Sequence, residues 1–297
     1  MRKPDFFVVG AAKSGTTALW KYFQQHPEIF VTDLIGNKEL GYYSNQYGID
    51  SEERYLSHFL SAKPHQLIGE VCHVYLTSEE SAKWIKKEVS NAKIIIILRH
   101  PVERAYSLYN WMTMHGYEYA TTFAKALKKE TKIINNTYDK TKLTHDFEKN
   151  YHYFNSGFYY NQVKRFLDTF GEQNVLILEY EEFLNHEKQV LNSIFNFLGV
   201  STDIQIVKGK TNKSKKVMSV PLQYWLKTYL NKTRGMGFKR KQLIQRAIKW
   251  NIIDKKPSAI SAKLKHQLEE GYAKDVKLLS ELCGIDFIEK WNIKTSK

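Results

Sequence analysis

The stretch that decides the fold is Asp5-Phe6-Phe7-Val8-Val9-Gly10-Ala11-Ala12-Lys13-Ser14-Gly15-Thr16-Thr17. Its apolar half predicts a short strand that ends at Gly10. The spacing of apolar residues over 16–26 predicts a helix, which Pro27 stops. A glycine-rich turn between a strand and a helix presents backbone N–H groups at the positive end of the helix dipole, where phosphate binds. The sequence therefore predicts a phosphate-binding loop at this turn, with an ordinary strand-helix turn as the alternative.

The alternation of strand and helix patterns continues along the chain. Ile94-Ile95-Ile96-Ile97-Leu98 is continuously apolar, which is typical of a parallel strand covered on both faces. We expect an α/β fold: a P-loop-like doubly wound sheet of about five mainly parallel strands flanked by helices, with a helical C-terminal part, in a single domain over 1–297. Strands are predicted at 5–9, 28–31, 67–72, 93–98 and 174–180, and helices at 16–26, 51–60, 78–89, 102–114, 157–170 and 181–198.

Two segments differ in composition from the rest. The stretch 128–150 is polar and weakly periodic, so we expect a mobile surface excursion, either an inert insertion or a lid. The stretch 208–256 is strongly basic, with Asp254 as its only carboxylate. Together with the net charge of +14, this basic segment predicts a surface that attracts anions: a nucleotide, an acidic glycan, nucleic acid or anionic lipid.

The cysteines and the apolar runs of the sequence indicate in which cellular compartment the protein is expected. Cys72 and Cys283 lie far apart without metal-like spacing, which indicates neither a disulfide framework nor a zinc site. No run approaches the ~20 apolar residues that cross a bilayer, and the N-terminus lacks a signal-peptide pattern. We expect a cytoplasmic protein with no transmembrane segment.

The loop differs from the ATPase and kinase loop in the position of its lysine. Thr16 stands where that lysine belongs, and Lys13 lies inside the loop, nearer the first phosphate. This position of the lysine suits a nucleotide donor with two phosphate-like groups better than a nucleoside triphosphate. Arg99 follows the strand at 93–98, where such an NTPase often carries an acidic residue for magnesium, so no metal requirement is expected. A nucleotide kinase or NTPase remains one alternative, and a non-catalytic basic binder of nucleic acid or membrane surfaces is another.

Two motifs carry a resemblance to a known family. Lys13-Ser14-Gly15-Thr16-Thr17 resembles the 5′-phosphosulfate loop of sulfotransferases that use 3′-phosphoadenylyl sulfate (PAPS). Arg99-His100-Pro101-Val102-Glu103-Arg104-Ala105-Tyr106-Ser107 is similar to the family's 3′-phosphate motif, an arginine at a strand end and a serine eight residues later. Further likeness, to bacterial sulfotransferase-domain proteins and glycosaminoglycan (heparan sulfate) sulfotransferases, extends over nearly the whole chain.

The resemblance implies transfer of a sulfuryl group from PAPS to a hydroxyl or amine, with release of 3′-phosphoadenosine 5′-phosphate (PAP) and no metal. It places Lys13 beside the leaving phosphate, and a basic loop and helices over the nucleotide within 208–256. Arg104 shares a helix face with Ser107 and is either an auxiliary phosphate ligand or a solvated surface residue. The nucleotide ligands that the resemblance implies are Lys13, Ser14, Gly15, Thr16, Thr17, Arg99, Ser107, Lys213, Ser214, Lys215 and Lys216.

The resemblance also implies a general base. Gly69-Glu70-Val71-Cys72-His73-Val74-Tyr75-Leu76 resembles a family segment whose glutamate takes the proton in glycosaminoglycan members, which here is Glu70. Val71 replaces a common lysine, and Cys72-His73 replaces a Ser/Thr-Pro pair. His73 is therefore a rival base, and a structural role for both residues stays open.

The remaining expectations concern charge and acceptor. Lys38, in a Lys-Glu-x-x-aromatic segment that resembles one lining the family's site, is expected to stabilise charge on the donor or acceptor, unless it is a solvated lysine. The expected partners are the nucleotide donor and a saccharide or other hydroxyl-bearing acceptor, anionic or neutral, and no specific nucleic acid. Lipid-linked, steroid-like and peptide tyrosine acceptors remain open.

Overall fold

The computed structural model describes residues 1–33, 38–44, 48–145, 147–207, 215–232 and 237–293. The chain divides into two compact units. The first comprises Met1–His100, Phe158–Gly209 and Lys274–Asn292, and the second comprises Pro101–Gly157, Lys210–Ala273 and Ile293–Lys297. The single domain over 1–297 stays a prediction, because both units are assembled from several segments of the chain.

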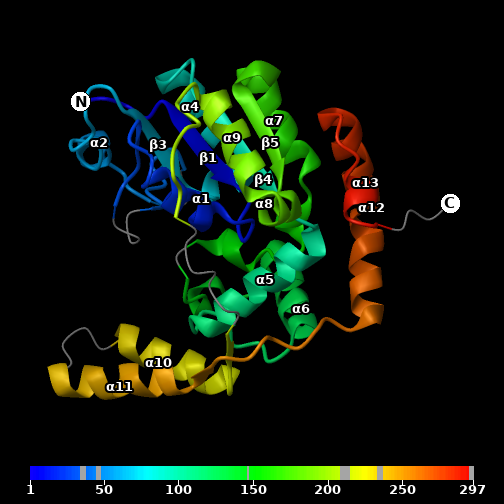
Figure 1. The fold of residues 1–297 in the computed structure, drawn as a ribbon. Coiled ribbons are helices and arrows are strands. Elements are labelled where there is room, and N and C mark those ends of the chain that lie inside the picture. Colours follow the sequence, from blue (N-terminus) through cyan, green and yellow to red (C-terminus); the bar gives the residue numbers. More distant parts are fainter. Residues whose placement is uncertain (34–37, 45–47, 146, 208–214, 233–236, 294–297) are drawn as a thin grey trace. The chain divides into compact units, whose positions relative to one another are not determined.

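A five-stranded parallel sheet forms the centre of the first unit, in the order β2-β3-β1-β4-β5. This confirms the predicted doubly wound sheet (Figure 1). The chain leaves β1 toward β2 on one side and leaves β4 toward β5 on the other, so the topological switch point lies at the carboxyl ends of β1 and β4, where sheets of this kind bind ligands. The strands are β1 (Phe6–Gly10), β2 (Ile29–Phe30), β3 (Leu67–Val71), β4 (Lys93–Leu98) and β5 (Val175–Glu179).

Helices bury both faces of this sheet. On one face, Phe6 and Val8 of β1 pack in one cluster with residues of α1 (Thr16–Phe23) and α9 (Glu187–Leu198). The opposite face carries Phe7, whose ring meets aromatic side chains edge-on. Burial of one large apolar side chain contributes about 1.5 to 3 kcal/mol to the free energy of unfolding. These two layers are therefore a main source of the unit's stability. Also in the first unit are α2 (Glu52–Ser57), α3 (Val74–Thr77), α4 (Ser81–Glu88), α7 (Tyr160–Phe170), η5 (Glu172–Asn174), α8 (Tyr180–Asn185) and α13 (Phe287–Lys290).

The second unit is mostly helical. A short antiparallel pair joins β6 (Lys216–Val217) to β7 (Ile252–Ile253). The long helix α12 (Ala262–Cys283) begins in this unit. Its other elements are α5 (Pro101–Met114), α6 (Phe123–Ile134), η2 (Lys140–Lys142), η3 (Glu148–Tyr151), η4 (Asn155–Gly157), α10 (Val220–Lys232) and α11 (Phe238–Trp250). Within the described ranges, no helix combines the length and hydropathy that a membrane crossing requires.

The structure differs from the sequence predictions in two segments. The expected excursion 128–150 begins inside α6, and Glu130 is buried there because its carboxylate accepts hydrogen bonds from the backbone N–H groups of Phe154 (2.8 Å) and Asn155 (2.7 Å). The mobility of the rest of that segment stays a prediction. The single helix predicted over 181–198 is two helices, α8 and α9, which meet at His186.

Candidate active site

The turn after β1 has the geometry of an anion-binding loop. Gly15, the residue before α1, has φ 87°, which disfavours other residues. A Cβ built there would lie 3.0 Å from the ring of Tyr180, so only glycine fits without displacement. The first N–H groups of a helix have no acceptor within that helix, and α1 directs them into this turn. At the switch point of the sheet, the turn therefore has the backbone geometry that an anion-binding loop requires.

Polar side chains of the loop are buried. Ser14 is fully buried, and its hydroxyl has no hydrogen-bond partner among the described residues. Thr16, the first residue of α1, is also buried, whereas Thr17 is half-buried. A buried hydroxyl without a partner costs about 1 to 3 kcal/mol, which a bound oxyanion would offset. The loop thus fits the phosphate end of a nucleotide.

Two cations lie together at the loop. Arg99, which follows β4, donates from Nη1 to the carbonyl of Lys13 (3.3 Å) and packs its guanidinium 4.7 Å from the ring centroid of Tyr180. Burial and the charge of Arg99 lower the pKa of Lys13 to about 8. An anion bound here would relieve the repulsion between the two cations and favour the charged lysine.

A carboxyl group that the sequence analysis did not single out lies beside Arg99. Glu181 Oε1 is 3.7 Å from Arg99 Nε. Burial and the neighbouring Glu179 raise the pKa of Glu181, and its proton weakens the competition with an incoming anion for Arg99. Glu179 is held by the indole N–H of Trp291 (3.0 Å), a residue near the end of the chain. Only the sheet brings β4 and β5 together, so no local sequence pattern signals this contact.

Ser107 and Arg104 lie on α5, in the second unit. Ser107 is half-buried. Its convergence with Arg99 of the first unit on one phosphate stays a prediction. Arg104 is buried and donates to the carbonyl of Tyr153, so the alternative of a solvated surface arginine is wrong.

The basic segment is described only in part. Lys213 and Ser214, predicted to cover the nucleotide, lie outside the described residues. Lys215 pairs with Asp254 (3.2 Å), and Lys216 begins β6. Their contact with a nucleotide stays a prediction.

Glu70, the predicted base, lies at the end of β3 in an aromatic environment. Its two carboxylate oxygens accept hydrogen bonds from the hydroxyls of Tyr55 (2.6 Å) and Tyr75 (2.6 Å), and Oε1 also accepts from the Gly41 N–H (3.3 Å). Glu70 is 3% exposed. Burial raises the pKa of Glu70 to about 7, although these three donors lower it. The environment therefore binds the carboxyl group in place and shields it from solvent.

A second carboxylate, Glu39, has the opposite environment. Its Oε1 lies 2.7 Å from Lys38 Nζ and 2.8 Å from His73 Nδ1. Burial raises the pKa of Glu39, but His73 and Lys38 lower it by more and hold it well below its usual range. Glu39 also raises the pKa of Lys13, so it belongs to the same charge cluster as the phosphate loop.

Glu39 is the glutamate of the Lys-Glu-x-x-aromatic segment, and the sequence alone predicted no role for it. The two residues that it did select nearby, Lys38 and His73, meet on one oxygen of Glu39. The only sequence signal for a role of Glu39 was its position next to Lys38 in the chain. The contact with His73 arises only because the loop before α3 folds beside it.

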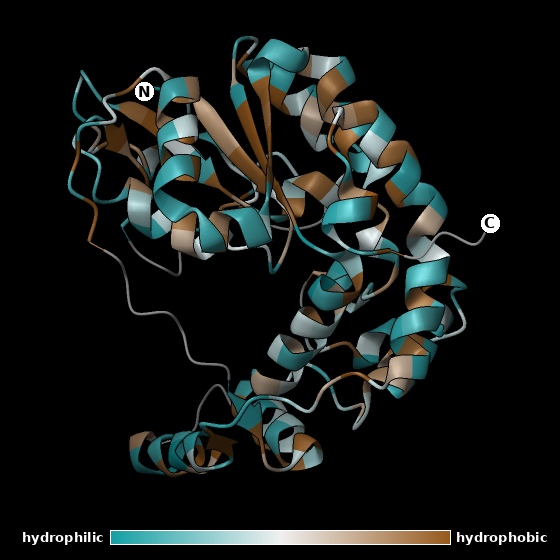
Figure 2. Cartoon of the chain, turned by 45° about the vertical axis from the view of Figure 1, so that its right-hand side comes forward, coloured by the Kyte–Doolittle hydropathy of each residue, from teal (hydrophilic) through white to brown (hydrophobic). Residues whose placement is uncertain are grey.

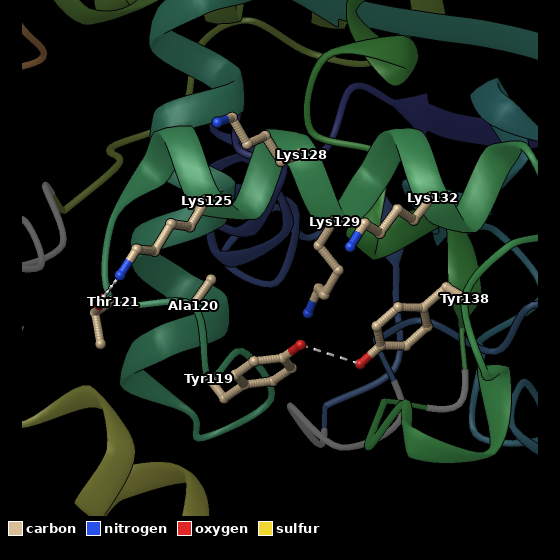
Figure 3. A pocket seen from close by; sticks show the side chains of 8 residues that line it. All are labelled: Tyr119, Ala120, Thr121, Lys125, Lys128, Lys129, Lys132 and Tyr138. Atoms are coloured by element: carbon tan, nitrogen blue, oxygen red, sulfur yellow. Dashed lines mark hydrogen bonds between the residues drawn. The ribbon is translucent and has the colours of Figure 1, made fainter.

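The second unit contains a cationic pocket of about 320 Å³ (Figure 3). Four of its lining residues are lysines of α6, and Figure 3 shows two tyrosines facing each other below that helix, joined by a hydroxyl contact of 3.5 Å. Lys129 is buried and pairs with Glu118 (2.5 Å), whereas Lys125, Lys128 and Lys132 are exposed. The pocket is lined by Tyr119, Ala120, Thr121, Lys125, Lys128, Lys129, Lys132 and Tyr138.

Three exposed lysines around one cavity attract carboxylates, sulfates or phosphates. In the part of the chain that the structure describes, no cluster of three or more His, Cys, Asp or Glu is arranged to hold a metal ion.

Comparisons with known proteins agree with this geometry. The sequence profile of the family described as "Sulfotransferase domain" matches residues 3–279. The crystal structure of a sulfotransferase from Alicyclobacillus acidocaldarius has a TM-score of 0.73 and 27% sequence identity, and the match covers 98% of this chain and 100% of that one.

Two curated relatives match over shorter stretches. Membrane-associated sulfotransferase kil1 of Dictyostelium discoideum is 36% identical over 110 residues, which are 36% of this chain and 23% of that protein. Bifunctional heparan sulfate N-deacetylase/N-sulfotransferase 1 of Caenorhabditis briggsae is 25% identical over 197 residues, which are 66% of this chain and 22% of that protein. The matched part of this chain thus spans less than a quarter of either curated relative.

Proposed function

This chain belongs to the sulfotransferase domain family, and from that membership we propose that it transfers a sulfuryl group from PAPS to a hydroxyl or amine of an anionic saccharide. The observation that carries the donor assignment is the phosphate loop itself. Ser14 contributes a buried hydroxyl without a partner among the described residues, and Lys13 and Arg99 lie together beside it. These groups provide the donors and the positive charge that a phosphosulfate requires.

Sulfuryl transfer requires stabilisation of the leaving phosphate. The bond between sulfur and the bridging oxygen breaks as the acceptor forms its bond to sulfur, and the bridging oxygen gains negative charge. We assign Lys13 to that charge, with Lys38 as a second cation on the donor or acceptor. Preorganised cations in a site with little water stabilise such charge more than they would in bulk water.

The proton released by the acceptor needs a base, and the geometry favours Glu39. Its carboxylate is ionised at neutral pH and lies in the charge cluster of Lys13. Glu70 stays the alternative, although both of its oxygens already accept hydrogen bonds from buried tyrosines. His73 supports Glu39 through its contact with Oε1 and is less suited to act alone.

The cationic pocket on α6 supports an anionic acceptor. Three exposed lysines and two tyrosines offer ionic contacts and ring surfaces to a chain of acidic sugars. The named activity of one relative concerns heparan sulfate, an acceptor of this class. The experiment is to measure labelled sulfate transfer to a heparan-type acceptor and to a neutral sugar acceptor.

The pocket can be tested with a matched pair of variants. In Lys128→Ala/Lys132→Ala, the KM for the anionic acceptor should rise about fivefold or more, with PAP affinity unchanged. The control is Lys83→Ala/Lys87→Ala, since both residues are exposed on α4 with the same spacing. Equal KM values in the two variants would exclude the pocket as an acceptor site.

The donor is tested by thermal shift. PAP should stabilise the protein, whereas ATP with magnesium or an oligonucleotide should not, because a ligand that binds only the folded state raises the melting temperature. The shift by PAP should shrink in Arg99→Ala. Stabilisation by ATP with magnesium alone would instead support a nucleotide kinase or NTPase.

A further inference from the structure

Helices α10 and α11 expose more large hydrophobic side chains than any comparable part of the described chain. Trp225 is 68% exposed, Phe238 is 74% exposed and Trp250 is 71% exposed. These exposed fractions are those of surface residues, and burial of such rings would remove a large apolar area from contact with water. The exposed large hydrophobic side chains on the two helices are Leu222, Trp225, Tyr229, Phe238, Leu243 and Trp250.

The exposed rings form stripes that also carry positive charge. Leu222, Trp225 and Tyr229 stand at positions i, i+3 and i+7 of α10 and therefore share one face. Leu243 and Trp250 share a face of α11 in the same way. Neither helix contains a carboxylate, and α11 alone carries five cations: Lys239, Arg240, Lys241, Arg246 and Lys249. Hydrophobic and hydrophilic residues alternate along this helix pair (Figure 2).

The two helices are held in a defined arrangement within the second unit. The amide of Asn251, just after α11, donates to the side chain of Gln223 on α10 (2.9 Å) and to the carbonyl of Ser219 (2.8 Å). Gln223 in turn donates to the carbonyl of Met114 on α5 (2.8 Å), and both amides are buried. The exposed rings thus project from a fixed platform rather than from a frayed end.

We propose that α10 and α11 form a docking surface for a lipid bilayer with anionic headgroups. Tryptophan, tyrosine and phenylalanine favour the boundary between headgroups and acyl chains, and cations beside them are attracted to anionic lipid. Neither helix contains a carboxylate that would repel anionic headgroups. This inference does not depend on the proposed function.

Two other occupants fit less well. A second copy of the chain would bring two cationic faces together, and these repel each other. A nucleic acid would match the charge and could stack on the rings, but it offers no apolar layer to Leu222 and Leu243. An acyl layer satisfies the rings, the leucines and the cations at once.

The test is cosedimentation of the full chain with vesicles. The protein should pellet with vesicles of equal parts phosphatidylglycerol and phosphatidylcholine but not with pure phosphatidylcholine, and added salt should weaken the binding. Lys239→Gln/Arg246→Gln should lower the partition coefficient by roughly 25-fold, since each cation near an anionic surface changes binding about fivefold. The charge control is Lys263→Gln/Lys277→Gln, at exposed lysines of α12, which should bind as the unmodified chain does.

Insertion of the rings is tested separately. Lipids brominated on the acyl chain should quench tryptophan fluorescence, and Trp225→Ala/Trp250→Ala should remove most of that quenching, whereas the control Trp84→Ala should retain it. Circular dichroism checks that each variant is folded. Failure to bind anionic vesicles would overturn the proposal, as would quenching unchanged in Trp225→Ala/Trp250→Ala. If vesicles do not bind and Trp225→Ala/Trp250→Ala abolishes concentration-dependent dimerisation, the surface belongs to a second copy of the chain. If vesicles do not bind and that variant loses oligonucleotide binding, the surface belongs to a nucleic acid.

Discussion

Half-buried Glu39 and fully buried Glu70 are two carboxyl groups of the first unit with opposite surroundings. Glu39 faces Lys38 and His73, which hold its pKa well below the usual range. Glu70 faces the hydroxyls of Tyr55 and Tyr75, and burial raises its pKa to about 7. The difference shows that residue type and strand-end position do not identify a base, because the surroundings decide whether a carboxylate is ionised at neutral pH and so able to accept a proton.

The largest expected effect is on kcat, and it distinguishes Glu39 from Glu70 as the base. Glu39→Gln should lower kcat by about 10²- to 10⁴-fold, because a well-placed general base contributes that much. Glu70→Gln should lower kcat less than Glu39→Gln does, and it should lower the free energy of unfolding more. Labelled sulfate transfer and urea unfolding of both variants provide the comparison. A folded Glu70→Gln variant with the larger loss of kcat would restore Glu70 as the base.

The next effect concerns the hydroxyls that hold Glu70. Tyr55→Phe and Tyr75→Phe should each lower the free energy of unfolding by about 1.5 to 3 kcal/mol, because each removes a hydrogen bond to a buried carboxyl group. Tyr42→Phe is the matched control, since Tyr42 stacks on Tyr55 with ring centroids 4.5 Å apart. Equal unfolding midpoints in the three variants would show that the tyrosine hydroxyls add nothing.

The cation at the phosphate loop provides a third effect. Since the pKa of Lys13 is lowered to about 8, the side chain loses its charge as pH rises above that value. Binding of PAP then requires uptake of a proton, and its Kd should rise by about tenfold per pH unit above 8. Lys13→Arg stays charged and should flatten the profile in calorimetry. A flat profile in the unmodified protein would contradict the assignment.

The smallest effect is the pH dependence that Glu70 gives to folding. Its pKa is raised above the ordinary value near 4.5, so the folded state binds the proton more tightly than the unfolded state does. The resulting stabilisation is complete below the unfolded pKa and is lost as pH rises through about 7. Relative to Glu70→Gln, the unmodified protein should lose about 1 kcal/mol of stability between pH 6 and pH 8. A constant difference would mean that Glu70 does not titrate there.

The sheet and the backbone of the strand, turn and helix over 6–23 could be predicted because their signals are local. The run of 93–98 is apolar at nearly every position, and β4 has those same bounds. The loop is a contiguous strand, turn and helix with glycine where φ is positive. Both depend on neighbours within a few residues.

The environments of the two glutamates and the helix α6 depend on distant residues. His73 and Lys38 are 35 positions apart, and no pattern indicated that they meet on Glu39. In α6, Lys129 and Glu130 are buried by partners elsewhere in the unit, so their charges masked the apolar periodicity. Hydropathy patterns treat such residues as exposed, which is why the segment was predicted to be irregular.

The ring of Tyr180 links two positions that lie far apart in the sequence. A substitution at Gly15 would press a Cβ against that ring, and the guanidinium of Arg99 also packs on the ring. Exchange of the loop glycine would therefore also disturb the arginine after β4. In evolutionary terms, Gly15, Tyr180 and Arg99 should vary together or not at all, so that a loop grafted from a relative requires its own tyrosine and arginine.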